Sequence, residues 1–202
     1  MLETGFIYST IIDPLLSNLR KRLALEIKKG DTVIDIACGT GAQLFELADK
    51  AKSVTGVDLS ASMISCATNK ARKEGITNAS FIVGDATDLS LFYQQKFDVA
   101  ILSMALHQFN PGLEKAILGE VKKIAEKIVV LDYAVPLPNN YVGVGSKVAE
   151  FLAGIEHNKN FKSYSEAGGL KTILPANGFA PQRLKVVGKG AFHLVVAQNH
   201  SA

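Results

Sequence analysis

The sequence VIDIACGTGAQL, residues 33–44, contains the pattern that decides the fold. An apolar run rich in β-branched residues comes first, small residues with two glycines follow, and an apolar pattern typical of a helix then resumes. Loops of this shape bring backbone atoms close to a ligand. A phosphate, a dinucleotide and an adenosyl sulfonium compound are three ligands that such a loop could hold, and the rest of the sequence has to discriminate among them.

Around this stretch, short β-rich runs alternate with amphipathic helical stretches. The pattern predicts strands at residues 32–37, 53–58, 79–85, 97–103 and 127–133. These strands are apolar almost throughout and are separated by helices, which is typical of a parallel sheet covered on both faces. Ser60 and the Asn110-Pro111 pair are expected to begin two of the helices, because these residue types are favourable at a helix N-terminus.

The flanking segments follow a different pattern. A helix is expected at residues 13–30, from an Asp-Pro start to a Lys-Lys-Gly stop. An apolar stripe predicts another helix at 144–155, and the capping-box spacing at 163–166 predicts the start of a further short helix. Two β-rich runs at 181–188 and 191–198 flank a Gly-Lys-Gly turn, which indicates a hairpin.

These boundaries predict a single domain over the 202 residues, a length that can bury a substantial core. Its expected parts are a helical arm at 1–30, a cofactor-binding core at 31–133, a helical lid at 134–178 and a C-terminal β-hairpin at 179–202.

Composition excludes several classes of protein. Apolar residues make up 48% and charged residues 20% of the chain, the net charge is +3, and the basic residues are scattered, so no nucleic-acid partner is expected. Cys38 and Cys66 form no CxxC or Cys/His pattern, and we expect neither a disulfide scaffold nor a metal site. Without a signal pattern or an apolar run of about 18 residues, the expectation is a cytoplasmic protein with no membrane span. Contact with a membrane surface and the oligomeric state stay open.

The glycine loop itself argues against two of its three ligands. A Walker phosphate loop needs a lysine, and no Lys or Arg occurs between Asp31 and Asp49. The dinucleotide fingerprint needs a third glycine, but that position is Leu44. A phosphate-free ligand with an adenosine ribose fits better, because the carboxylate of Asp58 suits a vicinal diol and Asp35 suits a positive charge.

Four motifs in order now point to a family. VIDIACGTG, VTGVDLS, FIVGDATDL and FDVAILSMALHQF resemble, in order and spacing, the successive motifs of class I S-adenosylmethionine-dependent methyltransferases. The resemblance covers residues 31–133, and the first glycine of the family's loop is Ala37 here. It implies an α/β fold: a Rossmann-like, seven-stranded, mostly parallel sheet with an antiparallel last strand, helices on both faces and a small helical lid before the C-terminal hairpin. It also implies S-adenosylmethionine as cofactor and S-adenosylhomocysteine as product.

The resemblance further implies a set of cofactor-binding residues, by their positions in the motifs. Those at the methionine part would be Asp35, Ala37, Cys38, Gly39 and Gly41, and those at the transferred methyl group Ser103 and Met104. Asp58 would accept from the ribose hydroxyls, while Leu59 and Met63 would pack near the adenine. Asp85, with Ala86 beside it, would accept from the adenine amino group.

The acceptor is less clearly marked. If the nucleophile must lose a proton, His107 is the first candidate for a general base, because it follows the fourth strand. Other polar residues that could face the acceptor are Tyr8, Asp132, Tyr133, His157 and Tyr164. A looser resemblance to quinone-biosynthesis and phospholipid methyltransferases, together with apolar residues in the arm and lid, favours a small, amphipathic or lipid-like acceptor.

Three functions therefore compete. The first is methyl transfer to such an acceptor, by an in-line displacement in which the protein aligns the reactants and excludes water. The second is a non-catalytic protein that binds S-adenosylmethionine for regulation or scaffolding. The third, an NAD-dependent reductase, is disfavoured by Leu44.

Overall fold

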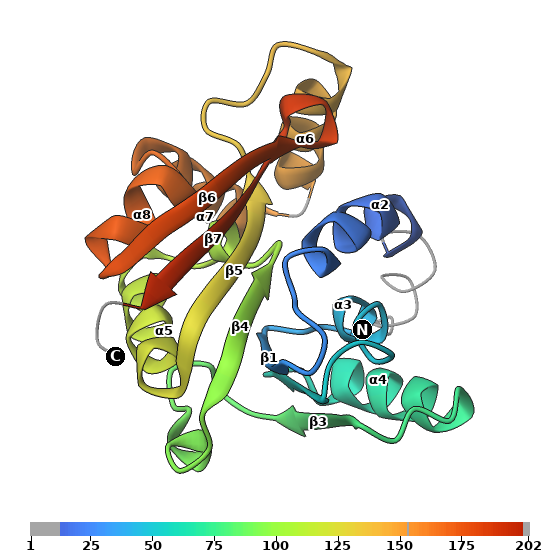
Figure 1. Ribbon diagram of the computed structural model, residues 1–202. Coiled ribbons are helices and arrows are strands. Elements are labelled where there is room, and N and C mark those ends of the chain that lie inside the picture. The colour runs from blue at the N-terminus through green and yellow to red at the C-terminus, as the bar shows by residue number, and fades with distance from the viewer. Residues whose placement is uncertain (1–12, 153, 200–202) are drawn as a thin grey trace.

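The computed structural model describes residues 13–152 and 154–199, and its centre is a seven-stranded sheet in the order β3-β2-β1-β4-β5-β7-β6 (Figure 1). The strands are β1 (Thr32–Ile36), β2 (Ser53–Asp58), β3 (Ala79–Val83), β4 (Phe97–Ser103), β5 (Ala125–Tyr133), β6 (Phe179–Val187) and β7 (Phe192–Asn199). Strands β1 to β5 pair in parallel, whereas β7 runs antiparallel to both β5 and β6. The predicted fold class, including the antiparallel last strand, is confirmed.

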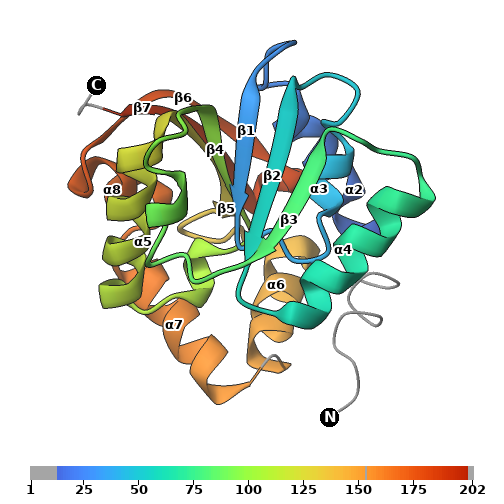
Figure 2. The same ribbon diagram turned by 90° about the horizontal axis from the view of Figure 1, so that it is seen from below.

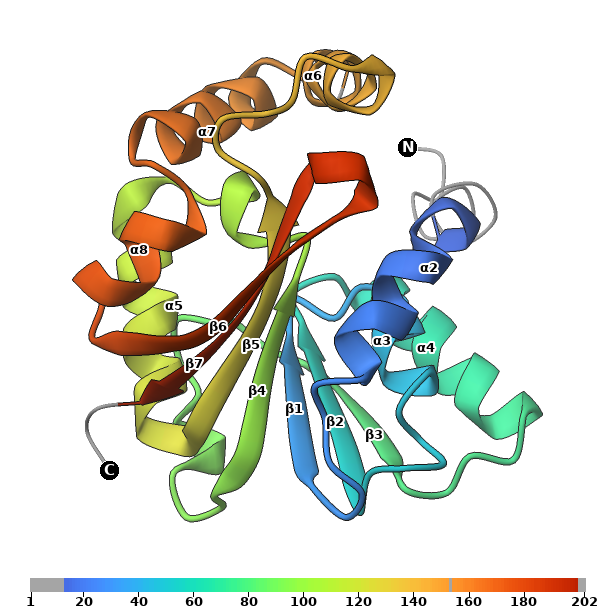
Figure 3. The same ribbon diagram turned by 45° about the horizontal axis from the view of Figure 1, so that its top comes forward.

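Helices cover both faces of the sheet. They are α2 (Asp13–Ala24), α3 (Ala42–Phe45), α4 (Ala61–Lys73), α5 (Pro111–Ile124), α6 (Tyr141–Leu152), α7 (Ile155–Glu166) and α8 (Leu170–Ala176), with short 3-10 turns η2 (Ser90–Phe92), η3 (Leu106–Gln108) and η4 (Gly188–Gly190). Seen from below, α2, α3 and α4 lie on one side of the sheet and α5 and α8 on the other (Figure 2). Helices α6 and α7 lie beyond the carboxyl ends of β4 and β5 (Figure 3). Within the part of the chain that the structure describes, no helix combines the length and apolarity that a membrane span requires.

Two helix starts follow directly from local side chains. Ser60 accepts a hydrogen bond on Oγ from the backbone N–H of Met63 at 3.4 Å, and Asn110 accepts on Oδ1 from Leu113 at 2.9 Å. Each side chain satisfies a backbone donor that has no partner inside the first helical turn. Both predicted N-caps are therefore confirmed, and they fix where α4 and α5 begin after the carboxyl ends of β2 and β4.

The helical segments outside the core depart from their predictions. The expected helix at 13–30 ends at Ala24, whose carbonyl accepts a hydrogen bond from Lys50 Nζ at 3.0 Å. The apolar stripe at 144–155 is divided between two helices, because the chain turns at Gly154 (φ 119°). Ile155, which starts α7, is 93% exposed and takes no part in an apolar stripe.

The prediction that residues 163–166 open a helix is wrong, since they form the end of α7. Two glycines explain the difference: Gly168 and Gly169 have φ of 88° and 63°, and the N–H of Gly169 donates to the carbonyl of Tyr164 at 3.1 Å. Such a left-handed exit is the usual way to end a helix. Tyr164 is buried and anchors this exit to β5, because its hydroxyl donates to the carbonyl of Tyr133 at 2.8 Å.

A close approach between β2 and the glycine loop gives the first testable prediction. A Cβ added at Gly56 would lie 2.7 Å from Cys38 Sγ and 2.8 Å from the ring of Phe81. Gly56→Ala should therefore lower the free energy of unfolding by about 1–3 kcal/mol, a typical cost of overpacking. Urea denaturation of the two proteins measures the difference.

Gly119→Ala is the matched control. A Cβ at Gly119, on the exposed face of α5, would meet no atom within 4 Å. This variant should gain roughly 0.5–1 kcal/mol, because alanine restricts the unfolded chain more than glycine does. A Gly56→Ala protein as stable as the parent would contradict the close approach.

Candidate functional site

A cavity of about 250 Å³ lies at the carboxyl ends of β1, β2 and β4, next to α2. In an open α/β sheet this edge, where the strand order reverses on either side of β1, is the usual place for a ligand. The residues predicted for cofactor binding that line the cavity are Asp35, Ala37, Cys38, Gly39, Asp58, Met63, Ser103 and Met104. The structure therefore brings these predicted residues to one cavity, and their role in cofactor binding stays a prediction.

The glycine loop adopts a left-handed backbone at two of the positions that line the cavity. Ala37 and Gly39 have φ of 57° and 54°, and the N–H of Cys38 donates to the carbonyl of Val57 at 3.0 Å. A non-glycine residue at positive φ carries a conformational cost. Ala37 bears that cost at a position where the family's loop has a glycine, and its small methyl group still leaves space for a ligand.

Asp58 fastens this loop to the end of β2. Its Oδ2 accepts a hydrogen bond from the N–H of Gly39 at 2.8 Å, and its Oδ1 accepts from the N–H of Ser60 at 2.9 Å. A carboxylate oxygen can accept more than one hydrogen bond. Asp58 is half-buried and lines the cavity, so it can hold the loop and still accept from a ligand.

Asp35 is the second acid at the cavity, in a very different setting. It is 1% exposed, and no hydrogen-bond partner for its Oδ1 is found in the described residues. Burial, followed by the charge of Asp58, raises the pKa of this carboxyl well above its usual value. The same burial raises the pKa of the Cys38 thiol, so Cys38 is a buried small side chain and not a reactive thiolate.

Several predicted residues lie outside the cavity lining. Leu59 is 74% exposed, and Asp85 is an exposed residue whose Oδ1 accepts from the N–H and the hydroxyl of Thr87 at 2.8 and 2.7 Å. These hydrogen bonds lower the pKa of the Asp85 carboxyl. Gly41 does not line the cavity either; it lies close to Phe81, because a Cβ at Gly41 would be 2.6 Å from the Phe81 ring. Ala86 is also absent from the lining.

The cavity also has lining residues that the sequence did not reveal. One group comes from α2: Leu16, Leu19 and Arg20. Thr40 of the glycine loop and Gln43 of α3 also line the cavity, as do Gln108 and Phe109 in the turn after β4. The apolar spacing of α2 predicted a buried face but gave no sign that this face covers a ligand site.

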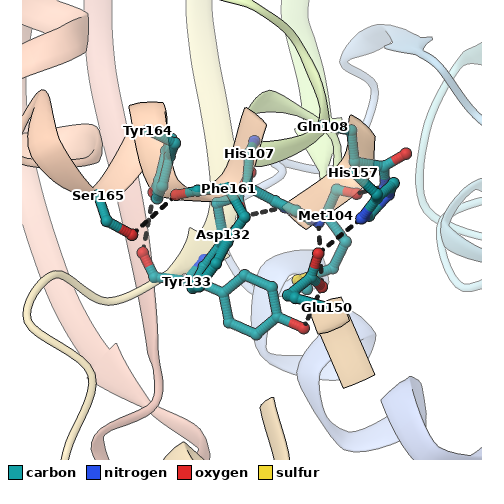
Figure 4. Close-up of polar contacts among 10 residues, drawn as sticks. All are labelled: Met104, His107, Gln108, Asp132, Tyr133, Glu150, His157, Phe161, Tyr164 and Ser165. Carbon is teal, nitrogen blue, oxygen red and sulfur yellow. Dashed lines mark hydrogen bonds and ion pairs between the residues drawn. The ribbon is translucent and has the colours of Figure 1, made fainter. Parts of the chain in front are cut away.

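Beside the cavity, a buried polar cluster joins α6 and α7 to the end of β5 (Figure 4). His107 Nδ1 donates to Asp132 Oδ1 at 2.6 Å, and Tyr133 donates from its hydroxyl to Glu150 Oε1 at 2.9 Å. His157 Nδ1 lies 2.7 Å from Glu150 Oε2. The structure thus brings together the predicted residues His107, Tyr133, His157 and, through the Tyr133 carbonyl, Tyr164. Tyr8 lies outside the described residues.

Glu150 connects this cluster, and the sequence analysis missed it. It is a single acid in a helix with no motif around it, and only its fold places it against residues 43 and 17 positions away in the chain, His107 and Tyr133. Its side chain is 6% exposed. A buried carboxylate needs partners, and Tyr133 and His157 supply them here.

The cluster also sets the ionisation of its members. Burial opposes the charged form of His107, but the neighbouring Asp132 and Glu150 outweigh it and raise the pKa of the imidazole above its usual value. Burial raises the pKa of the Tyr133 and Tyr164 phenols. A raised pKa keeps a larger share of His107 protonated, so less of it is in the neutral form that can accept a proton, and neither tyrosine offers a ready phenolate.

Comparison with known proteins adds independent findings. A family described as "Methyltransferase domain" matches residues 27–169. A demethylmenaquinone methyltransferase of Beutenbergia cavernae is 32% identical over 116 residues, which are 56% of this chain and 45% of that protein. A 23S rRNA (uracil(1939)-C(5))-methyltransferase of Aeromonas salmonicida is 34% identical over 110 residues, 52% of this chain and 24% of that protein. The chain thus spans less than half the length of these curated relatives.

Solved structures share the fold over almost the whole chain. A Pyrococcus horikoshii protein superposes with a TM-score of 0.72 at 22% identity, covering 94% of this chain and 92% of that one. Magnesium protoporphyrin IX methyltransferase of Synechocystis, described with bound S-adenosylhomocysteine, superposes with a TM-score of 0.67 at 21% identity. The match covers 93% of this chain and 83% of that one. At this identity the likeness is one of fold.

Proposed function

This chain belongs to the methyltransferase domain family, and from that premise we propose that it binds S-adenosylmethionine in the cavity at Asp35 and Asp58 and transfers its methyl group to a small or amphipathic acceptor. The observation that carries the proposal is the pairing of these two carboxylates with a loop that has no basic residue. A loop of this kind disfavours phosphates, and the two acids suit a nucleoside that carries positive charge; the basic side chain that lines the cavity, Arg20, comes from α2 and not from the loop.

The residues present fit this cofactor. Asp58 already has two backbone donors in place, so its carboxylate is held rigidly for the ribose hydroxyls. Asp35 has a buried oxygen without a described partner, and a cationic ligand would supply the missing interaction. The left-handed turn at Ala37 and Gly39 lets the backbone approach the ligand closely.

When bound, S-adenosylmethionine supplies an electrophilic methyl group on a sulfonium. The chain's own residues would then do three things: bind the cofactor, orient it and exclude water. Leu19 and Phe109 line the cavity with apolar surface, and Ser103 and Met104 sit at the end of β4, where we place the transferred methyl group. Alignment and desolvation are the main requirements of an in-line displacement.

For the acceptor, we propose a position between Met104 and the polar cluster. Tyr133 and Tyr164 are buried and hydrogen-bonded, so we assign them a structural role. The side chain of His157 is 28% exposed and can contact an acceptor. His107 is 2% exposed with Nδ1 engaged by Asp132, which favours a positioning role over that of a free base. The demethylmenaquinone relative supports a quinol-like acceptor. The proposal keeps the cytoplasmic location expected from the sequence.

The acceptor class is tested by following a labelled methyl group from S-adenosylmethionine. We expect label in quinols or other small hydroxylated aromatics, and less in phospholipids. Label found only in rRNA would overturn the small acceptor, an outcome that the rRNA-modifying relative makes worth testing. Tight cofactor binding without transfer to any acceptor would instead support the non-catalytic alternative, which the named methyltransferase relatives do not favour.

Cofactor binding depends on Asp58 in this proposal. Asp58→Ala removes the acceptor for the ribose hydroxyls and releases Gly39, so affinity for S-adenosylmethionine and S-adenosylhomocysteine should fall by about tenfold or more. Calorimetric titration measures it. Asp88→Asn is the control, because Asp88 is exposed and bonds Ser90 away from the cavity. Unchanged affinity in a folded Asp58→Ala protein would refute the assignment.

Binding should also release a proton. Asp35 has a raised pKa in the free protein, and a nearby cation favours its ionised form, so the bound state holds fewer protons than the free state. Titrations at one pH in phosphate and in imidazole, which both buffer near neutrality, should give enthalpies that differ in proportion to the buffers' ionisation enthalpies, with at most about one proton released per cofactor. Asp35→Asn should abolish the difference. Equal enthalpies for the parent protein in both buffers would contradict the prediction.

A further inference from the structure

Three ligand-type side chains converge in the polar cluster beside the cavity. His107 comes from η3, Glu150 from α6 and His157 from α7, and one ligating atom of each lies within 4.8 Å of the others (Figure 4). The rings of the two histidines are 5.7 Å apart and inclined by 74°. No spacing motif connects these residues, which is why the sequence gave no expectation of a metal site.

The hydrogen bonds leave a specific nitrogen of His107 available. A carboxylate can only accept, so Nδ1 carries the proton in its 2.6 Å contact with Asp132 Oδ1. The opposite nitrogen, Nε2, faces Glu150 Oε1 at 3.6 Å, too far for a strong hydrogen bond. A histidine that gives one nitrogen to a carboxylate and presents the other is the arrangement that orients metal ligands in proteins.

Asp132 is itself held in place. Its Oδ2 accepts from the backbone N–H of His107 at 3.2 Å, and its Oδ1 also accepts from the N–H of Tyr133 at 2.7 Å. The carboxylate is fully buried. It therefore fixes the ring of His107 and does not compete with Glu150 as a ligand.

Charge balance is the second argument. Asp132 and Glu150 put two negative charges in a buried space, and their ion pairs among the described residues are with histidines. Neutrality then requires either two additional protons, one on each histidine, or one divalent cation with both histidines neutral. Histidine and carboxylate are a donor set that zinc and similar transition metals prefer.

We propose that His107, Glu150 and His157 bind one divalent transition-metal ion of the zinc class, with Asp132 positioning His107. A tetrahedral ion with ligands at about 2.1 Å holds ligand atoms about 3.4 Å apart. The most widely separated pair, at up to 4.8 Å, would have to close by roughly 1.4 Å, whereas His157 Nδ1 and Glu150 Oε2, now 2.7 Å apart, would have to separate by about 0.7 Å if both bind the ion. The ion replaces the proton between His157 Nδ1 and Glu150 Oε2, which are 2.7 Å apart. His157 is the solvent-facing ligand through which the ion arrives.

Three protein ligands leave one tetrahedral position for water or for an oxygen of another molecule. Met104 and Gln108, on either side of His107 in the chain, line the cavity, so the ion lies next to the proposed methyl-transfer site. The metal site does not rest on the proposed function, because only side chains of this protein define it. It can therefore be tested without S-adenosylmethionine.

The test uses untagged protein freed of metal by a chelator and then titrated with Co²⁺ and Zn²⁺. We expect one equivalent of Co²⁺ with visible d–d absorption, displaced by one equivalent of Zn²⁺, and proton release as the metal binds. His157→Ala and Glu150→Gln should each weaken binding by at least about tenfold. Asp132→Asn should weaken it by about 10–100-fold, as loss of an orienting carboxylate does elsewhere.

Controls separate a site from general affinity. Glu156→Gln changes an exposed acid beside His157, and His193→Gln changes a histidine of β7 outside the cluster, so both should bind as the parent does. Whether a metal site exists is decided with the parent protein alone. If it binds neither Co²⁺ nor Zn²⁺ stoichiometrically, the proposal is overturned. Equal affinity in His157→Ala and Glu150→Gln would overturn it too, and would leave the cluster as a hydrogen-bond network that anchors α6 and α7.

A thermal readout covers variants that fold poorly. Zn²⁺ should raise the unfolding temperature of the parent, since a ligand that binds the folded state stabilises it. The same addition should shift His157→Ala, whose side chain is partly exposed, by much less. An equal shift in both proteins would place the bound ion elsewhere in the chain and contradict the assignment.

Discussion

The edge of the sheet that carries the cavity depends on the carboxylate of Asp58. It ends β2 and accepts from the backbone of Gly39 and of Ser60, so one side chain joins the glycine loop, the strand and the start of α4. Without that link, the left-handed turn at Ala37 would keep two backbone hydrogen bonds of 3.0 Å, from Cys38 N–H to Val57 and from Gly41 N–H to Cys38, and only the first of these reaches β2. An aspartate performs this task well because each of its oxygens can accept from the protein and still accept from a ligand.

A second constraint on the fold is the free-energy cost of burying carboxylic acids away from water. Asp35 is buried without a described partner for Oδ1, and its raised pKa favours the neutral form, which is less costly to bury. Asp132 and Glu150 are also buried, and hydrogen bonds and ion pairs with histidines and a tyrosine offset the cost of burying them. The first arrangement fits a ligand that brings its own positive charge, and the second fits a cation held by the protein. Both lie against the turn that follows β4.

The core was predictable because local and tertiary preferences agree there. Strands at 53–58 and 97–103 have the predicted bounds, and Ser60 and Asn110 cap the helices as their side chains suggest. The lid was less predictable, because glycines override its pattern. Residues 163–166 have a capping-box spacing, yet the exit at Gly168-Gly169 and the anchored hydroxyl of Tyr164 make them the end of a helix. Glu150 had no local signal, since its partners reach it only through the fold.

The turn after β4 links the two halves of the site physically. Met104 has φ of 56°, a strained backbone for a methionine, and its N–H donates to the carbonyl of Leu131 at 2.8 Å. That bond ties the turn to β5 directly beside Asp132, so the cavity wall at Met104 and the ring of His107 share one support. A shift of η3 would therefore move the cavity and the cluster together. Helices α6 and α7 reach the same turn through Glu150, His157 and the bond from Asn160 to the carbonyl of Gln108, so these two helices and the cavity wall at Met104 share their support.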